Sequence, residues 1–366
     1  MRIIFIGPMR LPITIDRGAI EKIIYYTSKK LYEKGHKVFI FNPISNNYIQ
    51  MFFNSVFLYK LIRKTKKEDE FIIHFHNLVA SPAFLIDHRI PAVLTLHYPP
   101  WIIKFPISAN IRLKILNLLT KTGLTITVPS QYVKNRLASI GLRSYYIPNG
   151  VDIVYFNPLK RNEILREKLL EGADFLLLNV ARVYHEKNQL DILRALNYVK
   201  KYNKYFKVIF VGPLSESYDY LYPNEYFNLL NNYILKYNLK NNVRFMGEMP
   251  YSKVAEIMAS SDIYLHPSLV ECFPLTILEA AASRLPIVAY DLPYYQGILI
   301  HGLNSLISHT GNVFSLADNI LKLMEDKKLA LRLGLNARQM VEKIFSWDKI
   351  VNQYQKLYFN IIEYGI

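Results

Sequence analysis

Short apolar runs alternate with helix-length segments throughout this chain, and that alternation constrains its fold more than any other feature. Strands that are apolar on both faces are typical of parallel sheets, because the helical crossovers between parallel strands cover both faces of the sheet. In the first half we expect strands at 3–6, 37–41, 71–75, 92–96, 124–128 and 145–147, with helices at 18–34, 51–66, 108–121 and 130–139.

The second half repeats this layout without repeating the sequence. Its expected strands are 175–180, 207–211, 243–246, 263–266 and 287–289, and its expected helices are 187–201, 223–237, 251–259 and 275–283. A final helix is expected in FSWDKIVNQYQKLYFNIIEYGI. Two such layouts predict an α/β protein with two Rossmann-like parallel-sheet domains.

The length supports the same division, because 366 residues exceed what a single hydrophobic core usually organises. The turn-forming segment IPNGVDIVYFNP connects the halves. We therefore expect a first domain at 1–150, a second at 151–345 and the C-terminal helix at 346–366.

Composition excludes several classes of protein. Cys272 is the only cysteine, which excludes a disulfide framework and suits a reducing compartment such as the cytoplasm. The sequence contains no Cys/His cluster with zinc spacing and no Asp-x-Asp, Gly-x-Gly-x-x-Gly or P-loop pattern. MRIIFIGPMR predicts a first strand rather than a signal peptide, and no stretch reaches the roughly 20 apolar residues of a membrane-spanning helix. We expect a soluble or peripheral protein.

Positive charge is concentrated in the first half of the chain. Residues 1–150 hold 21 Lys/Arg and 7 Asp/Glu, a net charge of +14, whereas residues 151–366 hold 24 and 22, a net charge of +2. A one-sided basic field attracts anionic partners such as lipid headgroups, phosphorylated lipids or nucleic acid. The alternative is a basic surface that has no partner. No nucleic-acid-binding motif accompanies the charge, so we expect no nucleic-acid partner.

Two glutamates frame the most informative segment, HPSLVECFPLTILEAAASRLPIV at 266–288. A strand leads into a loop that carries Glu271, and Pro274 then opens an Ala/Leu-rich helix with Glu279 in its second turn. A helix N-terminus after a tight loop binds anions, and neighbouring carboxylates bind hydroxyls. Phosphate and hydroxyls together describe a sugar nucleotide. The alternative is an ordinary strand–helix unit with two solvated glutamates.

This segment resembles the Glu-x7-Glu signature of the retaining glycosyltransferases of family 4. The positions that carry the resemblance are Pro267, Ser268, Glu271, Cys272, Phe273, Pro274, Glu279 and Ala280. Other segments agree in the same order along nearly the whole chain. The resemblance implies the GT-B architecture, in which two Rossmann-like domains face each other across a cleft and the C-terminal helix crosses back to the N-terminal domain.

The resemblance also implies the reaction. A sugar moves from a nucleoside-diphosphate donor, held in the C-terminal domain, to an acceptor hydroxyl, with retention of configuration and without a metal or cofactor. UDP, GDP and ADP all stay open as the nucleotide, as does the sugar. The competing function is a non-catalytic sugar-nucleotide-binding subunit of a glycosylation complex.

Arg182 and Lys187 follow the expected strand 175–180 and precede a helix. A departing diphosphate gains negative charge as the glycosidic bond breaks, and fixed cations stabilise that charge. Arg offers a planar fork to two oxygens, and Lys adds a compact point charge. The resemblance implies that this pair grips the diphosphate, although either residue alone would equally suit a solvated loop.

The resemblance assigns the other donor contacts to the glutamate segment. Glu279 would bind the ribose hydroxyls and Glu271 the hydroxyls of the donor sugar. The backbone N–H groups of Phe273, Leu275 and Thr276 would face the phosphates and the sugar.

Further candidates lie in the first half. His97 ends strand 92–96, and the resemblance implies that it contacts the donor sugar, although a lone His is more often structural. His74 and His76 are weaker candidates for structural or acceptor-shaping roles. Gly18 opens a helix where the family has a glycine-rich loop for the phosphate or sugar, and Arg17 replaces one of its glycines.

Two residues depart from the family pattern. Arg284 stands where the family usually has Gly, and Gly297 stands near the position of a common Glu. Both leave donor binding intact but put the identity of the sugar in doubt.

The acceptor is expected in the first half. Helix 51–67 is apolar on one side and ends in the basic residues Lys60, Arg63, Lys64, Lys66 and Lys67, and an exposed Trp101 is expected after His97. Basic residues with aromatics suit a membrane interface, although the apolar side would equally pack on a sheet. We expect a glycan or lipid-linked acceptor at the cytoplasmic face of a membrane.

Overall fold

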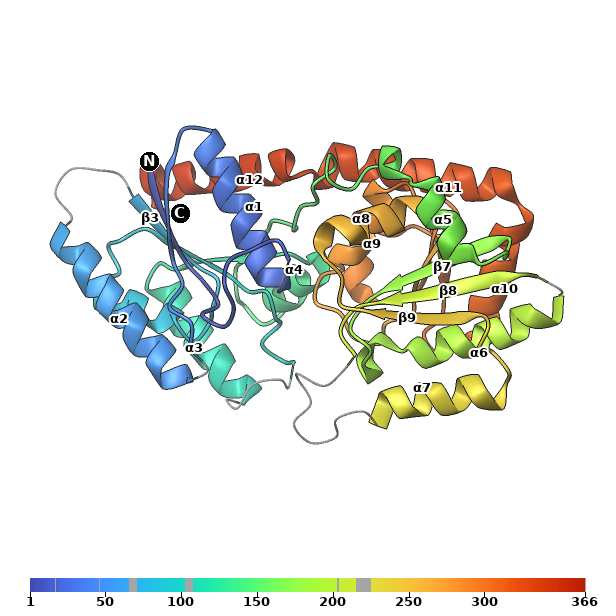
Figure 1. Ribbon diagram of the computed structural model, residues 1–366. Coiled ribbons are helices and arrows are strands. Elements are labelled where there is room, and N and C mark those ends of the chain that lie inside the picture. The colour runs from blue at the N-terminus through green and yellow to red at the C-terminus, as the bar shows by residue number, and fades with distance from the viewer. Residues whose placement is uncertain are drawn as a thin grey trace. The chain divides into compact units, whose positions relative to one another are not determined.

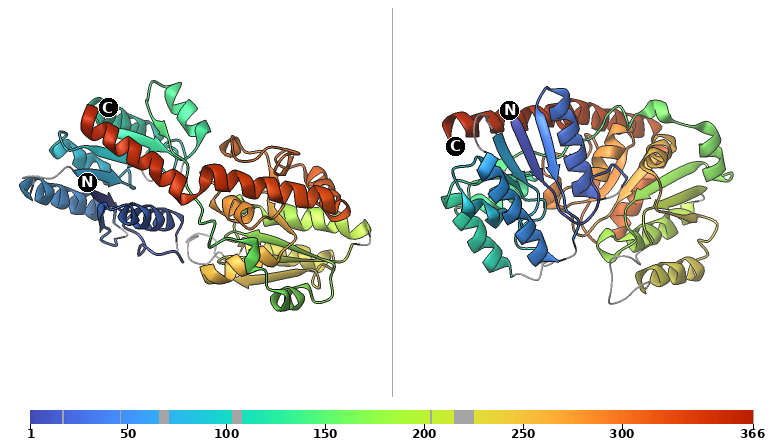
Figure 2. Two further views of the ribbon diagram at one scale, coloured as in Figure 1. Left: turned by 90° about the horizontal axis from the view of Figure 1, so that it is seen from above. Right: turned by 60° about the vertical axis from the view of Figure 1, so that its left-hand side comes forward.

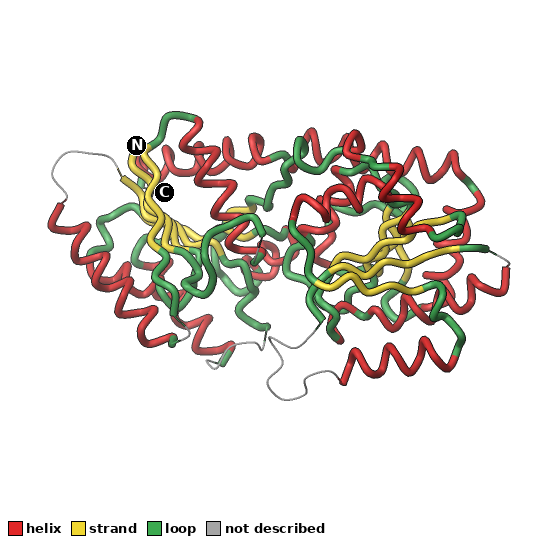
Figure 3. The backbone as a smooth tube through the Cα atoms, in the orientation of Figure 1, coloured by secondary structure: helices red, strands yellow, loops and turns green. Residues whose placement is uncertain are grey.

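The computed structural model describes residues 1–16, 18–45, 47–65, 71–102, 108–202, 204–214 and 225–365. The chain divides into two compact units. Unit 1 comprises Met1–Gly150 and Trp347–Ile366, and unit 2 comprises Val151–Ser346. Each unit contains a six-stranded parallel sheet with helices on both faces (Figures 1 and 3), which confirms the predicted fold class.

The sheet of unit 1 has the order β2-β1-β3-β4-β5-β6. Its strands are β1 Arg2–Ile6, β2 Lys37–Phe41, β3 Phe71–Phe75, β4 Ala92–Thr95, β5 Thr125–Val128 and β6 Tyr145–Tyr146. The helices of this unit are α1 Ala19–Glu33, α2 Tyr48–Thr65, α3 Ala109–Lys121, α4 Gln131–Ala138 and α12 Trp347–Tyr364, with a 3-10 helix at Ser81–Ile86. The C-terminal helix α12 packs on α1 and β3, as Figure 2 shows in red beside the blue elements.

The sheet of unit 2 has the order β12-β11-β10-β7-β8-β9. Its strands are β7 Phe175–Val180, β8 Phe206–Val211, β9 Val243–Gly247, β10 Ile263–His266, β11 Ile287–Tyr290 and β12 Leu306–Ser308. The α-helices are α5 Glu163–Leu170, α6 Gln189–Val199, α7 Glu225–Lys236, α8 Tyr251–Ser260, α9 Leu275–Ala282, α10 Val313–Glu325 and α11 Lys327–Met340. Short 3-10 helices lie at Pro158–Lys160, His185–Lys187, Lys200–Tyr202 and Pro293–Tyr295, and a π-helical turn lies at Val341–Phe345.

Apolar side chains of β7, β8 and β10 meet those of α6 and α10 in the core of unit 2, where Leu193, Phe210, Leu265 and Ile320 are almost fully buried. This packing fixes the strand ends that carry the functional residues.

Several elements of unit 2 were not predicted, namely α5, β12, α10 and α11. All three of these helices carry a local start signal that was available, because the side chains of Asn162, Asn312 and Asp326 accept hydrogen bonds from the first turns of α5, α10 and α11. The three-residue strand β12 has too short an apolar run to be distinguished from a loop.

Candidate functional site

The order of the sheet in unit 2 reverses between β7 and β10. These two strands are neighbours, with Ile263 paired to Leu177, but the chain runs outward from them in opposite directions. Ligands of open α/β sheets bind at the carboxyl ends of the strands that flank such a reversal. Lys187 follows β7 and Glu271 follows β10, so the fold brings both residues to this point.

A buried ion pair joins the two loops. Lys187 Nζ donates to Glu271 Oε1 at 2.5 Å, and both side chains are largely removed from solvent. His266 Nε2 lies 3.1 Å from the same oxygen. Burial alone raises the pKa of Glu271, but the charge of Lys187 and the hydrogen bond from His266 outweigh it and lower the pKa to about 2. Glu271 is therefore ionised at every pH at which the protein would work.

Backbone contacts hold the Lys187 loop in place. The N–H of Leu269, in the Glu271 loop, donates to the carbonyl of Glu186 at 2.8 Å. Gln189, the first residue of α6, donates through Nε2 to the carbonyl of Arg182 at 2.9 Å. The Arg182 side chain is exposed at the end of β7. The turn from Arg182 to Lys187 is thus fixed at both ends.

The segment after Glu271 differs in detail from the prediction. Pro274 is the residue before the helix rather than its first residue, and α9 begins at Leu275. The N–H of Leu275 already donates to the carbonyl of Phe273 at 3.1 Å, so it is not wholly reserved for a ligand. Phe273 is buried, and Leu275 and Thr276 are half-buried. Their contacts with phosphate or sugar stay predictions.

Glu279 lies on the buried face of α9. Tyr251, the first residue of α8, donates its hydroxyl hydrogen to Glu279 Oε1 at 2.7 Å. The Tyr251 ring stacks on Tyr155 with centroids 5.0 Å apart, and Lys160 Nζ lies 4.0 Å from the Tyr155 centroid. A carboxylate accepts hydrogen bonds on both of its oxygens, which is the chemistry that binding a hydroxyl requires.

His266 and Tyr251 touch the predicted glutamates but were not predicted as site residues. His266 stands in the segment that carries the family resemblance, so its burial at the end of a strand was the available signal. Tyr251 lies 28 positions from Glu279, and no spacing rule connects residues so far apart.

Unit 1 assembles a different group at the ends of its strands. His97 follows β4 and is buried, and its Nε2 lies 2.8 Å from Nδ1 of His76, which follows β3. The His74 ring lies 4.2 Å from that of His76 and is hydrogen-bonded to Tyr358 of α12. Burial lowers the pKa of His97 to about 3 and lowers the pKa values of His74 and His76 well below their usual range. We call these three residues the histidine cluster, and all three are neutral at pH 7.

Several polar atoms near these strand ends are buried without a partner among the described residues. They are His76 Nε2, Ser130 Oγ after β5 and Asn149 Oδ1 after β6. A buried polar group without a hydrogen bond lowers the stability of the fold by about 1–3 kcal/mol. A bound ligand that formed hydrogen bonds with these atoms would remove that penalty.

Gly18 precedes α1 at φ +73°, a left-handed conformation that favours glycine. A Cβ at this position would collide with the carboxylate of Glu21, which is buried in the first turn. Burial raises the pKa of Glu21, against a hydrogen bond from its own backbone and the charge of Arg10. The helix start at Gly18 therefore already holds a carboxyl group, and its contact with a donor stays a prediction. Arg17 lies outside the described residues.

Arg284 follows α9 at φ +63°, and Gly297 has φ +79°. A residue in this conformation after a helix is usually glycine, so the departure at Arg284 concerns the backbone at the end of α9. Gly334 of α11 approaches the Arg284 carbonyl so closely that a Cβ on Gly334 would overlap it.

Helix α2 is apolar on two faces. Met51, Ser55 and Tyr59 are buried on one face, four residues apart, whereas Ile49, Phe53 and Phe57 on another are 67%, 61% and 68% exposed. One apolar face therefore packs inside unit 1, as the alternative to a membrane interface requires, but a second apolar stripe stays outside. Of the predicted basic residues, Lys60 is exposed. Lys66, Lys67 and the side chains of Arg63 and Lys64 lie outside the described part of the chain.

The expectation of an exposed Trp101 is wrong. Its ring is half-buried, and the Arg136 guanidinium lies 4.3 Å from the ring centroid. The aromatic ring is used within unit 1 by a cation–π contact.

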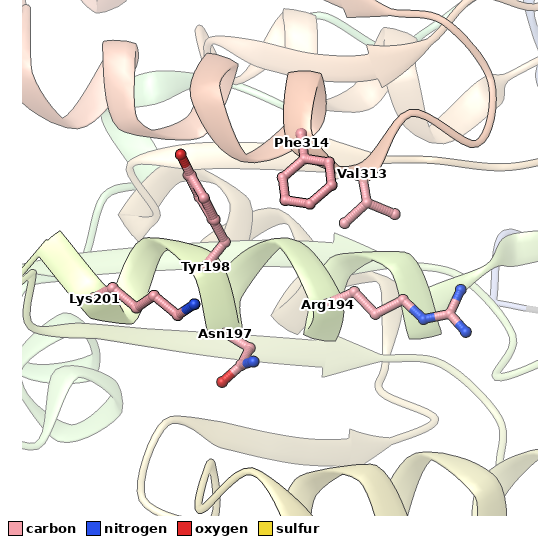
Figure 4. Close-up of a pocket in the computed structure, with 6 residues that line it drawn as sticks. All are labelled: Arg194, Asn197, Tyr198, Lys201, Val313 and Phe314. Atoms are coloured by element: carbon pink, nitrogen blue, oxygen red, sulfur yellow. The ribbon is translucent and has the colours of Figure 1, made fainter.

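A separate hollow of about 350 Å³ lies between α6 and α10 in unit 2 (Figure 4). The rings of Tyr198 and Phe314 line it in an edge-to-face arrangement, with centroids 5.6 Å apart. None of the predicted site residues lines this hollow.

Across the described ranges, no three or more His, Cys, Asp or Glu residues gather as a metal site would require. In the same ranges, no helix combines the length and apolarity needed to span a bilayer.

Two parallel-sheet units with a charged group at the strand reversal of the second define a protein of the GT-B class. Family models support this class along most of the chain. A model described as Glycosyltransferase Family 4 matches residues 20–155, and one described as Glycosyl transferases group 1 matches residues 160–340. The chain belongs to this family of retaining glycosyltransferases, and it is therefore a hexosyltransferase-type enzyme.

Two relatives match over most of this chain and most of their own length. A UDP-Gal:alpha-D-GlcNAc-diphosphoundecaprenol alpha-1,3-galactosyltransferase of Escherichia coli is 25% identical over 83% of this chain and 78% of its own. An alpha-monoglucosyldiacylglycerol synthase of Acholeplasma laidlawii is 23% identical over 84% of this chain and 80% of its own. Among solved structures, Anabaena HepE in complex with UDP matches with a TM-score of 0.81 and 22% identity, covering 98% of this chain and 100% of that one. The same Anabaena protein has also been solved with UDP-glucose.

Proposed function

We propose that this glycosyltransferase takes its sugar from a UDP-sugar and transfers it to a lipid-linked acceptor at an anionic membrane surface. The observation that carries the donor side is the Lys187–Glu271 pair at the strand reversal of unit 2, where a cation and an ionised carboxylate stand side by side. A sugar nucleotide needs both groups, because its diphosphate is anionic and its sugar carries hydroxyls.

The cations act on the leaving group. Lys187 has three donor hydrogens and spends one on Glu271, which leaves two for phosphate oxygens. Arg182, exposed at the end of β7, adds a planar fork with a second positive charge. Both stabilise the negative charge that develops on the diphosphate as the glycosidic bond breaks. We assign no protein nucleophile, since retention in this family is ascribed to attack on the face that the phosphate leaves.

The carboxylates act on hydroxyls. Glu279 binds the two ribose hydroxyls, and Glu271 binds the donor sugar, because carboxylate oxygens accept hydrogen bonds from hydroxyls. Backbone N–H groups around Phe273, Leu275 and Thr276 add donors for the phosphates at the start of α9. His97 is neutral, so it offers a sugar hydroxyl a hydrogen bond and no charge.

The choice of UDP rests on relatives. The Escherichia coli relative is named for a UDP-galactose donor, and the Anabaena structures hold UDP and UDP-glucose. The names of these two relatives, which match over 78% and 80% of their own length, both contain a lipid, a diphosphoundecaprenol in one and a glucosyldiacylglycerol in the other.

The outer stripe of α2 supports the membrane side. Ile49, Phe53 and Phe57 form an exposed apolar row on a unit whose sequence carries most of the positive charge. Exposed apolar rows mark interaction sites, and aromatics with cations are typical of helices that lie in a membrane interface.

A donor assay tests the first part. The protein is incubated with UDP-, GDP- and ADP-sugars, with and without EDTA, and release of free nucleoside diphosphate is measured. We expect turnover with UDP-sugars and little effect of EDTA. Turnover restricted to GDP- or ADP-sugars contradicts the nucleotide. Binding without turnover, in the presence of extracted lipid acceptors, favours the non-catalytic alternative.

Vesicle flotation tests the second part. The wild type should float with anionic vesicles at low salt and be released at 1 M salt, where the Debye length is roughly 3 Å. The double variant Phe53→Ser/Phe57→Ser should bind about tenfold more weakly, because it loses two apolar anchors. The control Leu159→Ser/Ile164→Ser removes two apolar residues of unit 2 that are even more exposed, and it should float like the wild type. Equal flotation of both double variants contradicts a membrane role for α2.

A further inference from the structure

His266 is the last residue of β10 and is 2% exposed. Its Nε2 lies 3.1 Å from Glu271 Oε1, the oxygen that also receives the hydrogen bond from Lys187 Nζ at 2.5 Å. Both protein donors therefore meet one oxygen of the carboxylate. In the part of the chain that the structure describes, Glu271 Oε2 receives no hydrogen bond from the protein.

We propose that His266 is a positioning residue, which fixes the Glu271 carboxylate so that Oε1 is committed to the protein and Oε2 faces a hydroxyl of the donor sugar. The sugar contact rests on the function proposed above. The orientation of the carboxylate rests only on the distances within unit 2.

The chemistry of the pair decides which nitrogen carries the proton. Glu271 is ionised and accepts hydrogen bonds only, so His266 Nε2 must bear a hydrogen. Two buried rings pack against the imidazole. Tyr264 stacks at 5.9 Å with its hydroxyl 3.4 Å from His266 Nδ1, and Tyr295 packs edge-on at 6.0 Å. These contacts restrict the movement of the imidazole ring.

Lys187 alone cannot set the orientation of the carboxylate. An ammonium is a point charge on a flexible stem, and it attracts either oxygen of a carboxylate that turns about its last bond. A second donor from a fixed ring removes that freedom. The hydroxyl of Tyr295 is buried near this group without a hydrogen-bond partner among the described residues, which adds a polar group for the same ligand.

Two substitutions separate positioning from packing. His266→Leu fills the buried position with an apolar side chain and removes the Nε2–H donor. His266→Gln places an amide N–H close to the position of Nε2 and restores it. With the best UDP-sugar as donor, we expect His266→Leu to lower kcat/KM about tenfold, because a misplaced binding group weakens the reacting geometry. We expect His266→Gln to recover most of that loss, and the Kd of free UDP, measured by calorimetry, to stay within twofold in both variants.

Unchanged kcat/KM in folded His266→Leu overturns the proposal, as does a loss in His266→Gln as large as in His266→Leu. A parallel weakening of free UDP binding does so too, because it would place His266 at the nucleotide rather than at the sugar.

If the wild type turns over no nucleotide sugar, the proposed function fails instead. The orientation is then read by NMR of the ¹⁵N-histidine-labelled wild type, with the His266 signals identified by their loss in His266→Gln. A proton on Nε2 supports the hydrogen bond to Glu271, and a bare Nε2 overturns it.

Discussion

The two units place chemically opposite groups at the carboxyl ends of their strands. In unit 2, Lys187 and the ionised Glu271 form a charged pair, in which the charge of Lys187 helps to lower the pKa of Glu271. In unit 1, the histidine cluster is equally buried but neutral, because burial outweighs every other influence on its pKa values. The same position in two similar sheets thus supports charge where a counter-charge is at hand and suppresses charge where it is not.

The difference indicates a division of work. A fixed positive charge stabilises the negative charge that develops on the diphosphate. Neutral imidazoles shape a surface and form hydrogen bonds without adding charge. Buried atoms without a hydrogen-bond partner among the described residues occur near both sites, His76 Nε2 in unit 1 and the Tyr295 hydroxyl in unit 2, so the two sites differ in charge and not in the completeness of their hydrogen bonding.

The largest expected effect breaks the charged side. Lys187→Ala and Arg182→Ala should each reduce transfer by roughly 100- to 1,000-fold, because each removes a cation from the diphosphate. Initial rates with a UDP-sugar measure the loss, and circular dichroism checks the fold. Lys201→Ala, which removes an exposed lysine beyond the opposite end of α6, is the control and should keep full activity. Undiminished transfer by a folded Arg182/Lys187 double variant rules out this mechanism.

The neutral histidine cluster of unit 1 should make the protein less stable in acid. The folded pKa of His97 is about 3, below its ordinary value of 6.5, so only the unfolded chain takes up the proton as pH falls from 6.5 towards 3. At pH 4.5 this single group should cost about 3 kcal/mol of stability. Urea unfolding at pH 7 and pH 4.5 measures the difference, which should shrink in His97→Gln. The exposed His88→Gln should behave like the wild type, and an identical acid loss in all three proteins would remove His97 as its source.

Glu271 should respond to pH in a lower window. Its folded pKa of about 2 lies below the ordinary 4.5, so its contribution is complete above pH 4.5 and is lost as pH falls towards 2. We expect about 2 kcal/mol of this contribution to disappear between pH 6 and pH 3. Denaturation curves of wild type and Glu271→Gln at both pH values test this. The variant is less stable at pH 6 but should show the flatter dependence, and parallel curves would mean that other carboxyl groups dominate.

The smallest expected effect concerns Arg284, which departs from the family pattern, and tests whether this residue influences the site around Lys187 and Glu271. Arg284→Gly should raise stability by about 1 kcal/mol, because Arg284 is held at φ +63° and glycine adopts that conformation without strain. Asn238→Gly is the matched control at φ +52°, where asparagine already tolerates the conformation. Transfer should be unchanged in both variants. A large change in sugar preference for Arg284→Gly would show that this residue reaches the donor.

Much of the architecture was predictable from local signals. Several predicted strands, such as Phe175–Val180 and Ile263–His266, agree with the structure to the residue, because buried parallel strands are continuous apolar runs. Helix α2 begins three residues earlier than predicted, and Pro274 precedes α9 instead of opening it. Ends of helices depend on capping geometry, which the hydrophobic pattern does not encode.

The charged site was predictable only in part. Arg182, Lys187, Glu271 and Glu279 could be named, because each follows a strand or lies on a helix in a segment with a family resemblance. That Glu271 binds Lys187 across 84 positions, and shares its oxygen with His266, could not be read from spacing. The exposed stripe on α2 was also missed, since an apolar pattern does not state which of two apolar faces meets the sheet.

The sequence by itself determined the two α/β layouts, the charge difference between the halves and the residue types at the strand ends, because these follow from local pattern and composition. Only the tertiary structure decided which of those residues are ionised. Charge at a buried position depends on the distance to a counter-charge and on the loss of water, and both are set by strands and loops far apart in the chain. For that reason Glu271 is a carboxylate beside Lys187 while His97, no less buried, is a neutral imidazole.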